Sequence, residues 1–168
     1  ERDVRQLKQV ENLQLFKRFV QLCAGRIGQL LNLSSLGNDC GISDATARRW
    51  ISLLEASYII VLLQPYHKNF NKRIIKSAKL YFIDTGLACS LLNIQKEHIS
   101  EHYLRGGLFE NMIIVDFYKQ FYNQGTVPQL YFWRDRTGHE VDLLVDKGNK
   151  TYPIEIKASR TISHSFFK

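Results

Sequence analysis

The stretch HEVDLLVDKGNKTYPIEIKAS, residues 139–159, constrains the fold more strongly than any other part of the sequence. Polar and aliphatic residues alternate on both sides of Gly148 and Asn149, a pair suited to a two-residue hairpin turn. Such a turn places Asp142 directly opposite Glu155. A three-residue loop is disfavoured, because it would place Asp142 opposite an isoleucine and break the alternation. We therefore predict an antiparallel hairpin over these residues.

This register predicts how the side chains of the hairpin divide between its two faces, since neighbours along a strand point in opposite directions. One face would carry Glu140, Asp142, Glu155 and Lys157, and the other Val141, Leu143, Ile154 and Ile156. Two opposed carboxylates repel each other unless a cation lies between them. Asp142 and Glu155 could hold Mg²⁺ or Mn²⁺ and leave other ligand positions to water and phosphate oxygens, with Lys157 orienting a nucleophilic water. The alternative is a solvated face in which Glu140 and Lys157 form a cross-strand ion pair.

The residues around this hairpin indicate an α/β unit. Residues 105–122 have helical spacing of apolar side chains, with the helix beginning near Gly107. Strand patterns follow in three places: 129–134, 139–146 and 151–158. One helix followed by three strands predicts an α/β unit with an antiparallel start.

The first half of the chain predicts a winged helix-turn-helix. Helical patterns cover residues 11–24, 33–39 and 44–57, and Ser43 is a suitable N-cap for the last of them. Two strand patterns, 59–64 and 79–84, enclose a basic turn region. The chain is thus predicted as an α+β protein with a mostly helical domain at 1–94 and the α/β module at 95–168.

Positive charge is concentrated in the first half. The net charge is +7, and residues 1–100 contain 14 Lys and Arg against 8 Asp and Glu. The interval between Glu55 and Asp84 contains five basic residues, Lys79 among them, and no acid. Such a field attracts nucleic acid, although a solvated strand face is the simpler alternative. The predicted DNA-contacting residues are Ser43, Thr46, Arg48, Arg49, Lys68, Lys72, Arg73 and Lys76.

Several classes of protein are disfavoured by composition. No apolar run approaches the roughly 18 residues of a membrane span, and the charged start does not resemble a signal peptide. The three cysteines are widely spaced, which favours reduced thiols in the cytoplasm over a disulfide or zinc framework. No GxxxxGK[ST] phosphate loop occurs, so the sequence predicts no ATP site within it.

Two resemblances extend these predictions. Asp142, then Glu155 and Lys157, with Glu110 on the preceding helix, resemble the PD-(D/E)XK nuclease-like fold. Almost the whole chain resembles the C-terminal region, of unknown function, of bacterial and archaeal AAA-type ATPases. That resemblance rests on ERDV, GQLLNLSSLGNDCGIS, NKRIIKSAKLYFIDTGL, GGLFENMII, FWRDRTGHEVDLLV and PIEIKAS.

The resemblance implies roles for residues and partners of the chain. Glu110, Asp142, Glu155 and Lys157 would be catalytic, with Asp142 and Glu155 holding Mg²⁺ or Mn²⁺. An ATPase domain would precede residue 1 in the same polypeptide, and ATP would bind only there. The nuclease-like core would be truncated, since a further helix and strand normally follow. Two functions are left open. One is metal-dependent hydrolysis of phosphodiesters with DNA as the partner, and the other is a non-catalytic regulatory or docking module. The chain could also form an oligomer.

Overall fold

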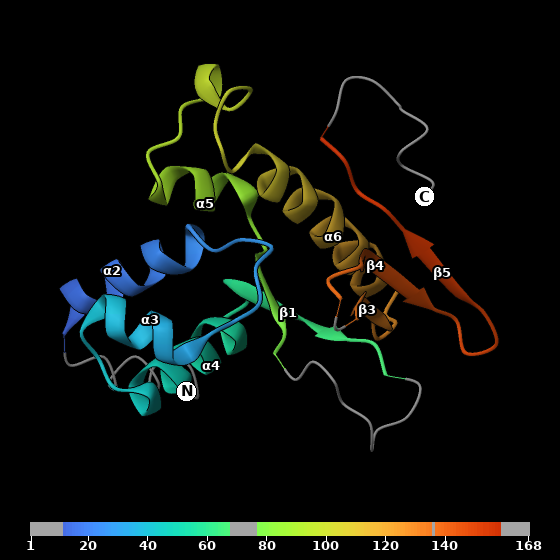
Figure 1. Cartoon of the computed structure of the whole chain (residues 1–168), viewed down its shortest axis with the longest axis horizontal. Helices are drawn as coiled ribbons and strands as arrows, with labels where there is room; N and C mark the ends of the chain where they lie inside the picture. Colours follow the sequence, from blue (N-terminus) through green and yellow to red (C-terminus); the bar gives the residue numbers. More distant parts are fainter. Residues whose placement is uncertain (1–11, 68–76, 136, 159–168) are drawn as a thin grey trace.

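The computed structural model describes residues 12–67, 77–135 and 137–158. It is a mixed α+β structure, as the sequence predicted, in which helices pack on a five-stranded sheet (Figure 1). The helices are α2 (Leu13–Ala24), α3 (Leu33–Cys40), α4 (Asp44–Ala56), α5 (Thr85–Leu91) and α6 (Arg105–Asn123), with a short 3₁₀ helix η1 (Lys96–His98). The strands are β1 (Ile60–Pro65), β2 (Lys79–Phe82), β3 (Leu130–Arg134), β4 (Glu140–Asp146) and β5 (Thr151–Ile154).

The three N-terminal helices form where the sequence predicted them, and local capping explains their boundaries. The side chains of Asn12, Asn32 and Ser43 each accept a hydrogen bond from the first turn of α2, α3 and α4 respectively. Gly41 ends α3 at a φ of 78°, a left-handed conformation that glycine adopts without a steric penalty. The boundaries of these helices are therefore encoded locally, by caps and one glycine.

The strands predicted as a wing, β1 and β2, belong to a larger sheet. The strand order is β2-β1-β3-β4-β5, so β1 pairs with β2 on one side and runs parallel to β3 on the other. The pairs Gln64–Tyr131 and Pro65–Phe132 make this parallel contact. Strands from both predicted domains thus share one sheet. The winged-helix and PD-(D/E)XK assignments remain predictions.

The sheet separates two apolar clusters. Leu80 and Phe82 of β2 pack with the helices α2, α3 and α4, whereas Tyr81 packs with α6, β3 and β4. In Figure 1, α2 to α4 lie on one side of β1, and α6 lies with β3 to β5. Alternation along a strand produces this division, because consecutive side chains point to opposite faces. The β2 strand therefore contributes to both clusters and is buried along its whole length.

Asn111 joins α6 to β2 inside the protein. This side chain is completely buried, and its Oδ1 accepts a hydrogen bond of 2.7 Å from the Phe82 backbone N–H. Its Nδ2 donates to the Phe82 carbonyl at 2.9 Å and to Thr85 Oγ1 at 2.8 Å. A buried amide that satisfies so many partners fixes the position of α6 on the sheet.

The predicted hairpin register is confirmed. Leu143 pairs with Ile154 and Asp146 with Thr151, and Lys147 N–H donates to the Lys150 carbonyl at 2.9 Å across the turn. The predicted length of the last strand is wrong, because β5 ends at Ile154 instead of Ala158. Residues 155–158 therefore follow the ladder and are not part of it.

The predicted division of faces is wrong at Asp142, because β4 contains a bulge. Between the pairs Tyr131–Leu144 and Trp133–Val141, β3 has one residue whereas β4 has two, Asp142 and Leu143. An extra residue in one strand reverses the alternation beyond it. Leu143 packs in the α6 cluster, and Asp142 senses the charge of Glu110 on α6. Both side chains of the bulge therefore lie on the α6 side of the sheet.

None of the helices in the described ranges is both long and apolar enough to cross a membrane.

Candidate functional site

Acidic side chains gather where the first turns of α6 face the sheet, and Glu110 is the first of them. Its Oε1 lies 3.0 Å from Lys79 Nζ and accepts a hydrogen bond of 2.5 Å from the Tyr81 hydroxyl. Lys79 and Tyr81 are alternate residues of β2 and point to the same face. The helix thus directs a carboxylate onto two polar groups of a buried strand.

Lys79 connects this carboxylate to a second one. Its side chain is only 3% exposed, and its ammonium also forms an ion pair with Glu140 of β4. Arg134 Nη1 lies 3.3 Å from the other oxygen of Glu140. Burial alone would lower the pKa of Lys79, but the interactions with Glu110 and Glu140 outweigh it and raise that pKa. Lys79 therefore stays charged inside the protein.

These contacts correct two predictions. The sequence placed Lys79 in a basic run available to nucleic acid, whereas the structure buries it between carboxylates. The sequence offered Lys157 as the partner of Glu140, whereas the ion pairs of Glu140 are with Lys79 and Arg134. Both errors arise because pairing within a hairpin does not reveal which strand or helix covers its face.

Gly28 allows the chain to pass close to Glu110. Its φ is +75°, and a β-carbon there would lie 3.5 Å from Glu110 Oε2. Its N–H donates to the Leu80 carbonyl at 2.9 Å, and Leu31 N–H donates to the Ala78 carbonyl at 2.7 Å. Residues 28–31 thereby cover the outer edge of β2.

Burial and the nearby charge of Glu110 also raise the pKa of the Tyr81 hydroxyl. This hydroxyl therefore stays protonated and donates its hydrogen bond to Glu110.

Asp142 belongs to a second, more open group. One of its oxygens, Oδ2, accepts a hydrogen bond of 2.8 Å from Ile156 N–H and lies 3.8 Å from Lys157 Nζ. Burial raises the pKa of Asp142, and the charges of Glu110 and Glu155 act in the same direction. The bulge and the end of β5 together create this arrangement, because residue 156 has left the ladder and its N–H is free for a side chain.

Lys157 and Glu155 complete the second group. They form an ion pair with each other, and their side chains are 46% and 37% exposed. The hydrogen bond that Lys157 donates to Glu155 is the main reason that the pKa of Lys157 is raised. The structure therefore brings Asp142, Glu155 and Lys157 together, as the sequence predicted, at a place that solvent reaches.

The donor chemistry of this group suits a hard divalent cation in part. Asp142 and Glu155 supply two carboxylates, and Mg²⁺ often takes one or two carboxylates together with water and phosphate oxygens. Glu110 does not join them as a third ligand, since Lys79 and Tyr81 engage its Oε1. In the described ranges, no three His, Cys, Asp or Glu side chains are grouped so as to hold a metal ion. Asp142 and Glu155 are thus the residues that would hold one.

The predicted DNA-contacting residues fall into three groups. Ser43 and Thr46 are engaged in the cap of α4, where Thr46 N–H donates to Ser43 Oγ at 3.2 Å. Arg49 is exposed and reaches Thr46 Oγ1 at 3.5 Å. Four basic residues of the turn region between β1 and β2 form the second group and lie outside the described residues: Lys68, Lys72, Arg73 and Lys76.

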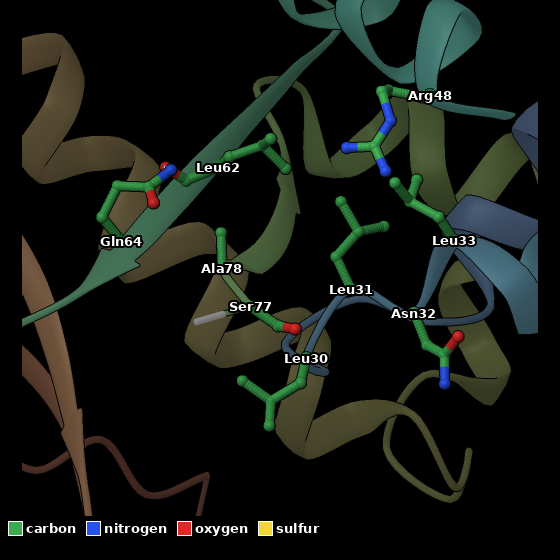
Figure 2. Close-up of a pocket in the computed structure, with 9 residues that line it drawn as sticks. All are labelled: Leu30, Leu31, Asn32, Leu33, Arg48, Leu62, Gln64, Ser77 and Ala78. Atoms are coloured by element: carbon green, nitrogen blue, oxygen red, sulfur yellow. The ribbon is translucent and has the colours of Figure 1, made fainter. Parts of the chain in front are cut away.

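Arg48 forms the third group, because it borders a pocket of about 730 Å³. Figure 2 shows its guanidinium near Leu31 and Leu33, with the β1 residues Leu62 and Gln64 across the pocket. The pocket lies between the predicted recognition helix and the sheet. A ligand of α4 that reached Arg48 would therefore also meet β1.

Sequence reasoning missed Lys79 and Tyr81 as parts of the site. A signal for them exists in KLYF, residues 79–82, where a lysine and a tyrosine share one face of a short apolar strand. A lysine at such a position needs a buried counter-charge. The sequence gives no indication that Glu110 and Glu140 supply it.

Two family models match successive segments of the chain. Residues 1–98 match the family model of a domain of unknown function (DUF8612), and residues 105–168 match that of another domain of unknown function (DUF4143). Two uncharacterized proteins, from Mycobacterium bovis and Mycobacterium tuberculosis, are each 30% identical over 166 residues, which is 98% of this chain. The chain spans 37% of the length of these relatives. No solved structure matches the chain.

Proposed function

The chain belongs to the DUF8612 family through residues 1–98. We propose that it is the nuclease-like, nucleic-acid-handling part of a larger ATP-binding protein. Its chemistry would be metal-dependent hydrolysis of a phosphodiester. The segment that matches DUF4143 carries Glu110, Asp142, Glu155 and Lys157. The ATPase domain would belong to the same polypeptide, consistent with relatives much longer than this chain.

One observation carries this proposal: the buried carboxylate of Asp142 meets the exposed side chains of Glu155 and Lys157. Asp142 and Glu155 would hold Mg²⁺ or Mn²⁺, which would lower the pKa of a bound water and stabilise charge on the phosphate. Lys157 Nζ, now near both carboxylates, would orient that water or neutralise developing charge. Glu110 would act from a distance, through Lys79 and through its charge on Asp142.

The test is cleavage of end-labelled single-stranded and duplex DNA by this chain with Mg²⁺ or Mn²⁺. We expect cleavage by the wild type and a loss of about 100-fold or more in rate for Lys157→Met and for Asp142→Asn. Mn²⁺ should also raise the melting temperature of the wild type, but not that of Asp142→Asn. If Mn²⁺ produces neither heat nor a thermal shift and no DNA is cut, hydrolysis by this chain is excluded.

A second candidate function is a non-catalytic docking module that positions the ATPase on DNA or on a protein. The observation that favours it is the neutralisation of the carboxylates by resident lysines, Lys79 for Glu110 and Glu140, and Lys157 for Glu155. This candidate predicts DNA binding without metal and without cleavage. Lys157→Met would then weaken the affinity for DNA only by the loss of a single contact with a phosphate.

DNA contact by the first half has its own test. Arg48→Ala combined with Lys72→Ala should weaken DNA binding and reduce the slope of log affinity against log salt by about two, one for each lost phosphate contact. Lys119→Ala, on the exposed surface of α6, is the control. Arg26→Ala would not serve, because Arg26 forms an ion pair with Asp39. An unchanged slope in the double variant would shift the proposal toward protein docking.

A further inference from the structure

A separate apolar pocket lies between α5, the beginning of α6 and the residues that follow β5. Its volume is about 320 Å³, within the range of roughly 300–1,000 Å³ that is usual for small-ligand sites. The apolar wall is made by Cys89, Ile99, Leu108, Phe109 and Met112. Figure 1 shows α5 and the first turns of α6 near one another.

Two cationic side chains, Arg105 and Lys157, border the same pocket. They differ in their partners. Lys157 is already paired with Glu155 and lies near Asp142. Within the described part of the chain, no hydrogen bond or ion pair engages the guanidinium of Arg105, which is half-buried. An arginine beside an apolar surface without a counter-ion is a ready partner for an incoming anion.

The shape and the charge of the pocket define the chemistry of its ligand. Apolar walls favour a hydrocarbon body, since burying it removes apolar surface from water. A planar guanidinium binds a carboxylate or phosphate through two parallel hydrogen bonds. A cationic ligand would meet two like charges, and a neutral one would leave Arg105 without a partner.

From these observations we infer that this pocket binds a small anionic amphiphile, a hydrocarbon chain that ends in a carboxylate or phosphate. The anionic group pairs with Arg105, and the chain lies against Leu108, Phe109 and Met112. Neither the phosphodiester chemistry nor the DNA contact proposed above is needed for this binding. Lys157 borders both places, so an occupied pocket lies next to the group formed by Asp142 and Glu155.

Calorimetric titration of this chain with decanoate, kept below its micelle concentration, tests the inference. Decanol and decyltrimethylammonium provide the same hydrocarbon chain without the negative charge, and decyl phosphate distinguishes the two anionic groups. We expect saturable binding of one or both anions, and weakening by about tenfold or more in Arg105→Gln, because a charge-assisted hydrogen bond is lost. Lys119→Gln, which removes a cation from the exposed surface of the same helix, is the matched control and should bind as the wild type does.

A second measurement uses the half-buried Cys89 thiol in the pocket wall, since Cys23 and Cys40 are buried. Bound decanoate should slow the alkylation of Cys89. Ala158→Phe, which fills part of the pocket with a larger side chain, should abolish the binding of decanoate and its effect on the alkylation rate. Melting temperatures of the variants establish that they are folded. The inference is overturned if neither anion binds saturably, if decanol binds as tightly as decanoate, or if folded Arg105→Gln retains wild-type affinity.

Discussion

Two lysines, Lys79 and Lys157, neutralise carboxylates on the same side of the sheet, yet their surroundings differ. Lys79 is 3% exposed, lies inside β2, and bridges carboxylates from α6 and β4. Lys157 is 46% exposed, follows the end of β5, and pairs with a residue two positions away. The first is held by three elements of the fold, and the second belongs to a short segment beyond the ladder.

This difference separates a structural ion pair from one that a ligand can enter. Removing one partner from a buried pair leaves an uncompensated charge in a medium of low polarity. An exposed pair is replaced by water at little cost. We therefore expect Lys79 to govern stability, whereas Lys157 should govern binding.

The largest predicted effect is that of Lys79→Met. This change should lower the free energy of unfolding by about 3 kcal/mol or more, because Glu110 would lose its cation and Glu140 would keep only the more exposed Arg134. Urea unfolding measures the loss. Combining Lys79→Met with Glu110→Gln and Glu140→Gln should recover much of it, since no buried charge would then lack a partner. A Lys79→Met protein as stable as the wild type would refute the distinction between the two lysines.

Next in size is Asn111→Ala, which tests the uncharged contact between α6 and β2. The loss should be about 2 kcal/mol, since the buried Phe82 N–H and carbonyl would lose their partner. Thermal or urea unfolding measures it. Gln120→Ala, which removes an exposed amide that donates to Asp116 on the same helix, should change stability by less than about 0.5 kcal/mol.

Asp142→Asn should act in the opposite direction and raise the melting temperature by a few degrees at neutral pH. Burial raises the pKa of Asp142, so the ionised carboxylate is less stable in the folded chain than in the unfolded chain. This penalty is present above the raised pKa and absent below the ordinary pKa of an aspartate. The asparagine side chain can still accept the hydrogen bond from Ile156 N–H.

The advantage of Asp142→Asn should therefore shrink as the pH falls through the raised pKa of Asp142. Melting temperatures of the two proteins across a range of acidic to neutral pH measure this. A constant difference would show that the ionisation of Asp142 is not its source.

Lys157→Met should change stability by less than about 1 kcal/mol, since solvent reaches the side chains of both Lys157 and Glu155. The same variant should lose about 100-fold or more in the rate of DNA cleavage, as proposed above. Measuring unfolding and cleavage on one preparation sharpens the comparison with Lys79. A strongly destabilised Lys157→Met protein would place the two lysines in the same structural class.

Local signals in the sequence determined much of the fold. The caps at Asn12, Asn32 and Ser43 and the left-handed Gly41 depend on a few neighbouring residues, so their helices were predictable to within a few positions. The hairpin register was predictable for the same reason, because a two-residue turn fixes which residues face one another. The contact of Asp142 with Lys157 depends in addition on the bulge in β4 and on the end of β5 at Ile154.

Only the tertiary structure decided which residues share the site with them. The bulge at Asp142 and Leu143 depends on how β3 pairs with β4, and Lys79 meets Glu110 and Glu140 only because β2 joins the same sheet under α6. These contacts join residues far apart in the chain, and alternation within one strand carries no information about its neighbours. The sequence by itself thus determined the helices and the register of the hairpin that carries the acidic residues. Long-range packing decided which carboxylates are neutralised inside the protein and which remain open to a ligand.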